Sequence, residues 1–329
     1  MLILQPMLLV LMGLSLVFGF LNGFHDSANI VAATISSRAL PPRTALVLAA
    51  VSVFAGPFLF GVAVARTVGA DLLDPTALRS EVVVAALSAA VVWNLVTWYF
   101  GIPSSSSHAL VGGLVGAAAV ANGIGSLKVQ GLAKVLLALF ISPPLGLLAG
   151  FLMLRAVLFL LRGASPSINQ QLRRAQIFTL IGLGLSHGSN DGQKTIAVLT
   201  LGLVTAGVLP NFQVPLWVIA VSGGAMALGI SMGGWRLIRT LGGRLFRIRP
   251  VHGFVAQLAG ATVILGAAMV GGPVSTTHVM SSAIMGAGAG QRVNQVRWMV
   301  LREMTIAWVL TIPATAIFAG LVVFVLDSV

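Results

Sequence analysis

The sequence has very little charge for its length. Of its 329 residues, 8% are charged and 57% are hydrophobic, and the mean hydropathy is +1.02. Ordinary soluble domains carry about 25% charged residues, and one soluble core cannot bury this much apolar surface. Disordered chains are polar and rich in charge, so the composition excludes disorder as well. It leaves a membrane protein that crosses the bilayer several times.

Two further features are missing. The chain has no cysteine, which excludes disulfides, iron–sulfur clusters and zinc–thiolate sites. Its apolar runs are continuous and lack the polar–apolar alternation of a transmembrane β-barrel. Because backbone groups in lipid must pair internally, we predict an all-α polytopic membrane protein. The apolar stretch Met1–Phe20 precedes the first basic residue, Arg38, so we expect a first membrane segment there and not a signal peptide.

The apolar runs divide the chain into segments of membrane-spanning length. A spanning helix needs roughly 20 residues, and we therefore expect about 10–12 transmembrane or re-entrant helices. The ten predicted segments are Met7–Ser36, Thr44–Ala65, Val82–Phe100, Ser104–Ala121, Val135–Leu161, Gln176–Val204, Val214–Gly234, Gly253–Val270, Ser275–Ala289 and Thr305–Leu326. The fourth and ninth are candidates for re-entrant segments.

The charges lie mainly in the loops between these segments. There are 19 Lys and Arg against 7 Asp and Glu, a net charge of +12. Such loops set membrane orientation, which explains the positive charge better than nucleic-acid binding does. The loop 236–249 has five arginines and no acid, so we place it in the cytoplasm of a multi-pass cell (inner) membrane protein. Arg66–Glu81, with three acidic residues, then lies outside, as do Lys128 and Lys134, against the usual charge bias.

An internal repeat organises the chain. Each half contains a block around one aspartate and, later, a Ser/Thr block that ends in histidine: Asn22–Asn29, Pro103–His108, His187–Lys194 and Pro273–His278. The aspartate and the later histidine are 82 residues apart in the first half and 87 in the second. Five segments per half make the second half start on the opposite face. We therefore predict two inverted repeats, 1–165 and 166–329, as in many secondary transporters.

Asp26 and Asp191 stand inside apolar segments. Placing a carboxylate in a membrane costs about 2.5–3.5 kcal/mol on insertion scales, so such residues are candidates for function. Gly23, Gly188 and Gly192 lower the helix propensity around them. We expect a broken helix at each aspartate, with free backbone groups lining a cavity.

The two Ser/Thr blocks follow Pro103 and Pro273. Proline, serine and threonine favour helix starts, where free N–H groups and the helix dipole attract an anion. Ser104–Ser107 and Ser275–Thr277 would supply donors to a tetrahedral oxyanion from two sides. The histidines that end the blocks are expected to orient the site or carry a proton. His187 and His252 are expected to be structural or interfacial.

Two carboxylates repel an oxyanion. A pair of like charges at 4 Å costs about 4 kcal/mol at an effective dielectric constant of 20. A proton, a sodium ion, a divalent metal or Lys194 must therefore intervene. If the cation comes from solution, binding of the two ions is coupled, which indicates symport and not a passive channel. An enzyme is not expected, because the G-x-S-x-G match at 229–233 lies at the end of a membrane segment and needs a strand–turn–helix setting.

These motifs resemble the Pit family of inorganic phosphate transporters. The resemblance is carried by the four repeat blocks and by the stretch Ala307–Thr315. It implies a phosphate symporter with inverted repeats, a homodimer without a cofactor. His25 and Lys194 depart from the Asn-Asp-x-Ala-Asn pattern of sodium-coupled members and look like the bacterial, proton-coupled, low-affinity branch. The expected activity is import of inorganic phosphate by proton symport, alone or as a divalent metal–phosphate complex; sodium coupling and sulfate transport are the alternatives.

The resemblance also assigns site residues. Phosphate would be bound by Ser105, Ser106, Ser107, Asn190, Asp191, Gln193, Lys194, Ser275, Thr276 and Thr277. Cation or proton coupling would involve His25, Asp26, Asn29 and Asp191. A metal carried with phosphate would meet Asp26 and Asp191. The expected partners are inorganic phosphate, the lipid bilayer and a second copy of the chain, and no nucleic acid.

Overall fold

A computed structural model describes residues 6–74, 79–243 and 248–328, so Arg244 and Arg247 of the basic loop lie outside the described residues. The described chain is helical, with one isolated β-bridge between Leu73 and Leu127, which confirms the predicted all-α class. The helices are α1 (Pro6–Ser36), α2 (Pro42–Phe60), α3 (Ala63–Ala70), α4 (Ser80–Phe100), α5 (Ser106–Asn122), α6 (Val129–Leu160), α7 (Ile168–His187), α8 (Gln193–Thr205), α9 (Leu216–Met232), α10 (Trp235–Gly243), α11 (Pro250–Met269), α12 (Thr276–Gln291) and α13 (Trp298–Leu326).

Each of the ten predicted segments coincides with helix, but α6, α7 and α13 begin before the predicted starts and α10 lies in no predicted segment. Other differences are breaks within the segments. The second segment divides into α2 and α3 at Gly61, whose φ of 78° is accessible to glycine. The sixth divides into α7 and α8 at a π-helical turn, Gly188–Gly192. The short helix α10 is bent by 68° from α9.

Six helices in the described chain are long and apolar enough to cross a membrane: α1, α2, α4, α6, α11 and α13. The bent pair α9 and α10 makes a seventh if it counts as one span. Helices α5 and α12 have 17 and 16 residues and begin at buried residues. That these two segments are re-entrant stays a prediction.

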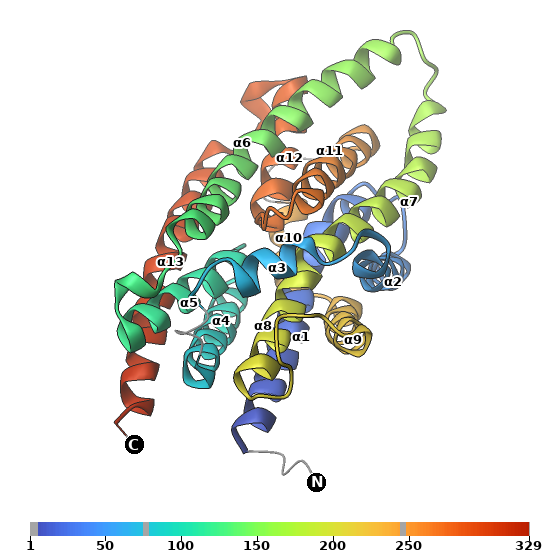
Figure 1. The fold of residues 1–329 in the computed structure, drawn as a ribbon. Coiled ribbons are helices and arrows are strands. Elements are labelled where there is room, and N and C mark those ends of the chain that lie inside the picture. Colours follow the sequence, from blue (N-terminus) through green and yellow to red (C-terminus); the bar gives the residue numbers. More distant parts are fainter. Residues whose placement is uncertain (1–5, 75–78, 244–247, 329) are drawn as a thin grey trace.

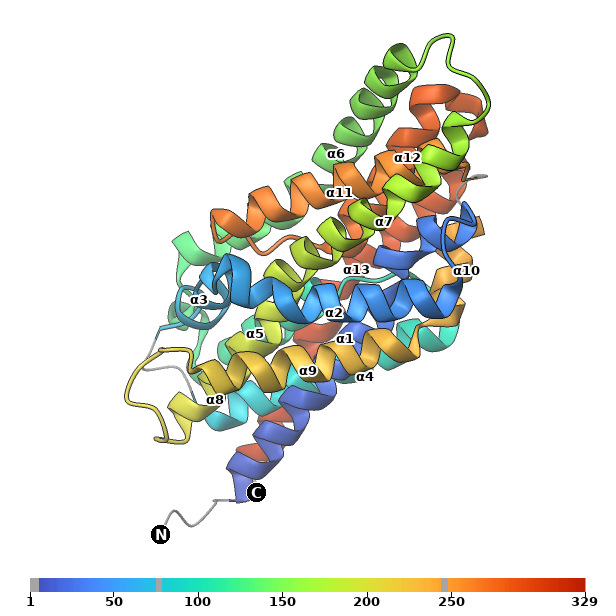
Figure 2. The same ribbon diagram turned by 90° about the vertical axis from the view of Figure 1, so that its right-hand side faces the viewer.

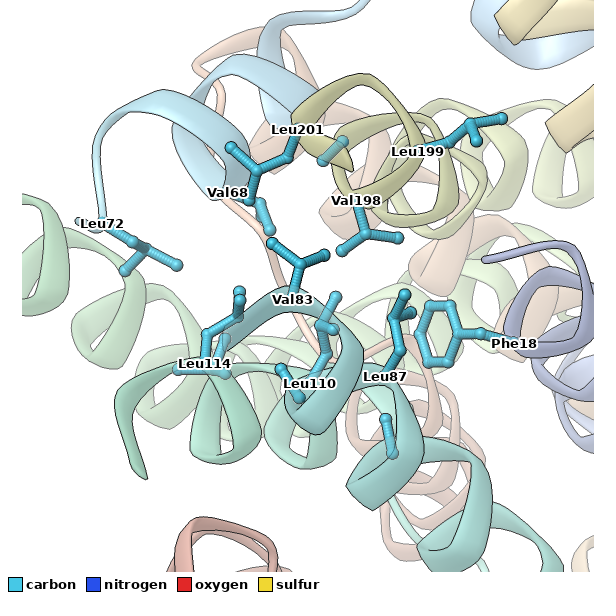
Figure 3. Close-up of a cluster of buried hydrophobic side chains, with 14 of the residues drawn as sticks. Phe18, Val68, Leu72, Val83, Leu87, Leu110, Leu114, Val198, Leu199 and Leu201 are labelled. Atoms are coloured by element: carbon cyan, nitrogen blue, oxygen red, sulfur yellow. The ribbon is translucent and has the colours of Figure 1, made fainter. Parts of the chain in front are cut away.

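The described helices form two large apolar clusters and a small third one around Leu154, and polar residues of α1 lie between the two large clusters. Figure 3 shows part of the first, where Phe18 of α1, Leu87 of α4, Leu110 of α5 and Val198 of α8 meet. The second gathers the last turns of α1 with α2, α7, α10, α11 and α12. Helix α1 runs through both clusters, and its residues 22–27 fall between them. In Figures 1 and 2, α6 and α13 lie on one side of α1, and α2 and α9 on the other.

The glycines of the aspartate blocks allow close helix packing. A Cβ at Gly23 would collide with the Met226 carbonyl of α9, and one at Gly188 with the Val53 carbonyl of α2. Small residues at such contacts are typical of membrane helices. Helix α1 continues unbroken through Asp26, so the predicted break there is wrong. Gly23 lets α9 approach closely while the backbone hydrogen bonds of α1 stay intact.

Helices α5 and α12 end at opposite ends of the molecule. After α5, Lys128 donates to the Ala70 carbonyl at the end of α3 (3.0 Å). Gln291, the last residue of α12, forms a hydrogen bond with His252 at the start of α11 (2.6 Å). The other end of α11 contacts α3, and a helix of 20 residues spans about 30 Å. The two Ser/Thr helices therefore leave the centre in different directions.

Candidate functional site

Asp26 of α1 lies at the centre of the molecule and is fully buried. Its Oδ1 accepts hydrogen bonds from Asn29 (2.9 Å) and Thr277 (3.1 Å), and His25 Nδ1 lies 3.3 Å away. Asn29 also donates to the Thr277 hydroxyl (2.9 Å). The other carboxylate oxygen of Asp26, Oδ2, has no hydrogen-bond partner among the described residues. The aspartate block of the first half thus meets the Ser/Thr block of the second half.

Asp191 lies in the π-helical turn between α7 and α8 and is also fully buried. One of its oxygens pairs with the Lys194 ammonium, and the other accepts from the Thr276 hydroxyl. Lys194 also donates to the Ser107 hydroxyl and to the Val274 carbonyl (3.1 Å). Lys194 therefore joins the second aspartate to both Ser/Thr blocks.

His187 is the site residue that the sequence interpretation missed. Its Nε2 lies 3.3 Å from Asp191 and 3.9 Å from Asp26, between the two carboxylates. Neither of its ring nitrogens has a hydrogen-bond partner among the described residues, and the side chain is fully buried. Its position four residues before Asp191, one helical turn away, was the available signal. The expectation of an interfacial residue is therefore wrong, because His187 is buried between the two aspartates.

Three of these groups have the spacing of metal ligands. One atom each from Asp26, His187 and Asp191 lie within 4.8 Å of one another. Ligand atoms that each lie about 2.0–2.4 Å from an ion are about 4.0–4.8 Å apart when they stand on opposite sides of it. Two of the atoms, Asp26 Oδ2 and His187 Nε2, lack other partners among the described residues. The donor set therefore suits a cation between the two aspartates.

Both Ser/Thr blocks begin helices, as predicted. Ser105 is the N-cap of α5 and accepts from the His108 amide (3.2 Å), and Ser275 is the N-cap of α12 and accepts from the His278 amide (3.3 Å). Such caps leave other first-turn N–H groups free for an anion. The capping hydroxyls turn to their own helices, whereas those of Ser107, Thr276 and Thr277 face the charged centre.

The remaining predicted residues surround this centre. Ser106 donates to Asn22 of α1 (2.5 Å), and Asn190 donates to the Gly272 carbonyl (2.9 Å). Gln193 donates to the Gly61 carbonyl (2.6 Å) and accepts from the Ala65 amide (2.9 Å). Its side-chain amide thus holds the break between α2 and α3, next to the site, and a contact of Gln193 with phosphate stays a prediction.

The three other histidines lie outside the charged centre. His108 and His278 stand with ring centroids 4.5 Å apart, and Trp308 stacks on His278 at 3.8 Å. His252 accepts from the Arg249 amide (3.1 Å) and so caps α11, as expected of a structural residue.

The site is closed and electrically unbalanced. Every predicted site residue is at most 2% exposed, and so are the neighbouring His187 and Asn22. Two carboxylates face one ammonium there, and the low local dielectric strengthens every interaction among them. An anion can join this centre only together with positive charge. The arrangement therefore fits coupled binding of an oxyanion and a cation.

Comparison with known proteins finds phosphate transporters among the relatives of this chain. A probable low-affinity inorganic phosphate transporter of Bacillus subtilis is 44% identical over 319 residues, 96% of each chain. A protein of the same description from Rhizobium meliloti is 41% identical over 326 residues, 98% of each chain. A solved structure described as the sodium-dependent phosphate transporter superposes with a TM-score of 0.91, covering 99% of this chain and 100% of its own, at 23% identity. That structure confirms the fold.

The family itself is shown by a sequence model that matches most of the chain. The model describes the phosphate transporter family and matches residues 22–319, from the first aspartate block to the last helix. All four repeat blocks lie within the match. The protein is thus a multi-pass membrane protein that belongs to the phosphate transporter family.

Proposed function

We propose that this protein imports inorganic phosphate by proton symport and binds it where the starts of α5 and α12 face the two aspartates. The observation that carries the proposal is the convergence of both Ser/Thr blocks on Asp26, Asp191 and Lys194 in one dehydrated centre. Hydroxyls and free N–H groups from two helix starts suit a tetrahedral oxyanion. Lys194 contacts Ser107 in this conformation, so it would shift or share that hydroxyl when phosphate binds.

The carboxylates favour phosphate over sulfate. Hydrogenphosphate carries an O–H that donates a hydrogen bond, whereas sulfate only accepts. An ionised Asp26, whose Oδ2 lacks a hydrogen-bond partner among the described residues, could accept that bond. A buried carboxylate facing an oxyanion without a donor is left unpaired, which costs about 1–3 kcal/mol or more. Sulfate is therefore the second candidate, disfavoured by the two acids.

The proton is favoured as the coupling ion by the residues that differ between the two halves. His25 lies beside Asp26, 3.3 Å from its Oδ1, and offers a second group that can bind a proton. Lys194 stands in the second half where Asn29 stands in the first. A fixed ammonium next to Asp191 supplies the charge that a sodium ion would bring. Sodium coupling remains the alternative.

A divalent metal could be carried together with the phosphate. As cargo it would contact Asp26, His187 and Asp191, whose ligand atoms are suitably spaced. The metal would offset the charge of phosphate at the same centre. Transport of a neutral metal–phosphate complex would then need little further positive charge from the protein.

Alternating access is supported by the directions of α5 and α12. Both begin at the centre and end at opposite ends of the molecule, as two inverted repeats, 1–165 and 166–329, would require. Rocking of these halves would open the closed site to one side at a time. A homodimer is part of the same proposal, although the site described is complete within one chain.

Uptake into proteoliposomes tests the proposal. Radiolabelled phosphate should accumulate when a pH gradient is imposed without sodium, and labelled sulfate should not. Adding magnesium or zinc at constant pH would reveal cotransport of metal. Uptake driven only by sodium, or a preference for sulfate, would contradict it.

A further inference from the structure

A group of basic residues lies at the end of the molecule where α3 is found, away from Asp26 and Asp191. A cavity of about 600 Å³ opens there between α3, α6 and the segment after α11. Its lining includes Arg66 of α3, Lys134 of α6 and Gly271. A neighbouring cavity of about 520 Å³ shares Lys134 and adds Lys128.

The two cations of the first cavity are available to a ligand. Arg66 and Lys134 are exposed, and in the described part of the chain no carboxylate oxygen lies within 4.0 Å of either. The Lys134 ammonium donates to the Thr67 hydroxyl (3.2 Å), which fixes it at the cavity wall. Asp71 is the one acidic residue in the lining. The cavity is therefore open to solvent, and its lining carries a net positive charge.

Short peptide segments separate this cavity from the candidate phosphate site. Gly271 lines the cavity, and the carbonyls of the next residues, Gly272 and Val274, bind Asn190 and Lys194 of the site. On the other side, Arg66 follows Ala65, whose amide donates to Gln193 (2.9 Å). An anion in the cavity would thus rest directly on the elements that cover the site.

The position of these cations runs against the usual membrane charge bias. Helix α10, which carries Arg236 and Arg239, packs on the last turn of α1 near the start of α2, whereas α3 follows the end of α2. With the arginines in the cytoplasm, the cavity end lies outside, where the positive-inside rule disfavours lysines. A cleft with charges of one sign raises the local concentration of an oppositely charged substrate. We propose that the cavity between Arg66 and Lys134 is an encounter site that holds hydrated phosphate before it enters. This inference rests on the proposed phosphate transport.

Charge removal tests the encounter site. In proteoliposomes, Arg66→Gln combined with Lys134→Gln should raise the KM for phosphate about 3–10-fold and change kcat less than twofold. The difference should vanish near 1 M salt, where the Debye length is about 3 Å. Arg43→Gln is the matched control, because Arg43 is exposed at the other end of α2. An unchanged KM, or an equal rise in the control, would overturn the encounter site.

The absence of cysteine allows a second test. In Lys134→Cys, a cationic methanethiosulfonate reagent should restore a low KM, and an anionic reagent should raise it further. Equal effects of the two reagents would show that size and not charge matters, and would refute the proposal. If the wild type takes up phosphate but neither variant alters KM, only the encounter site fails. If the wild type takes up no phosphate, the proposed function fails.

Discussion

Replacing Lys194 by asparagine removes the ammonium that pairs with Asp191. In the described structure, Lys194 contacts Asp191, Ser107 and the Val274 carbonyl and is 1% exposed. Without it, Asp191 keeps the Thr276 hydroxyl as a donor but faces Asp26 with no fixed positive charge. Leaving a buried charge without its partner costs about 3–5 kcal/mol, and Coulomb's law at an effective dielectric constant of 20 gives about 4 kcal/mol at 4 Å.

This energy predicts a change in ion dependence. A factor of ten in binding corresponds to 1.4 kcal/mol, so about 4 kcal/mol favours a mobile cation by up to roughly three orders of magnitude. Much of this gain would be offset by dehydration of the incoming ion. We therefore expect sodium to stimulate phosphate uptake by Lys194→Asn at constant pH at least tenfold more than in the wild type.

The assay is uptake of labelled phosphate into proteoliposomes at fixed pH while sodium replaces a large organic cation. Lys194→Met keeps the length but not the charge and should show the same new dependence, whereas Lys194→Arg should not. Gel filtration and thermal unfolding in detergent check that each variant folds. If the folded asparagine variant keeps the ion dependence of the wild type, Lys194 does not act as a fixed cation and the electrostatic reasoning is wrong.

Four other substitutions have definite expected outcomes. Asp26→Asn and Asp191→Asn should each reduce phosphate uptake to near background while the protein stays folded, because each removes a central carboxylate. His187→Ala should weaken binding of zinc, measured by calorimetry, by 10-fold or more, because it deletes one of the three proposed ligands. Gly23→Ala should destabilise the protein by about 1–3 kcal/mol through overpacking against α9, seen as a lower Tm, whereas Gly13→Ala should not.

Each of these has a contradicting result. Uptake at the wild-type rate by both asparagine variants would remove the carboxylates from the mechanism. Unchanged zinc binding in folded His187→Ala would place the metal elsewhere. A Tm of Gly23→Ala equal to that of Gly13→Ala, where a Cβ meets nothing within 4 Å, would refute the packing argument.

The sequence by itself determined the helical membrane class, the helix positions and the main candidates of the site. Apolar runs of spanning length can lie in a bilayer only as helices, because no water is present to pair an extended backbone. Asp26 and Asp191 were found because charge is costly in that setting. Proline followed by serine or threonine located the starts of α5 and α12 to within two residues, since capping is a local interaction.

Only the tertiary structure decided which of these residues meet. Asn29 binds Thr277 across 248 residues of sequence, and Lys194 binds Ser107 across 87; no local pattern specifies such pairs. The place of His187 between the aspartates depends on how α7 packs against its neighbours. Gly23 illustrates the same limit. Propensity predicted a broken helix, but a close approach of α9 explains the glycine, because packing between helices can outweigh the weak preferences of single residues.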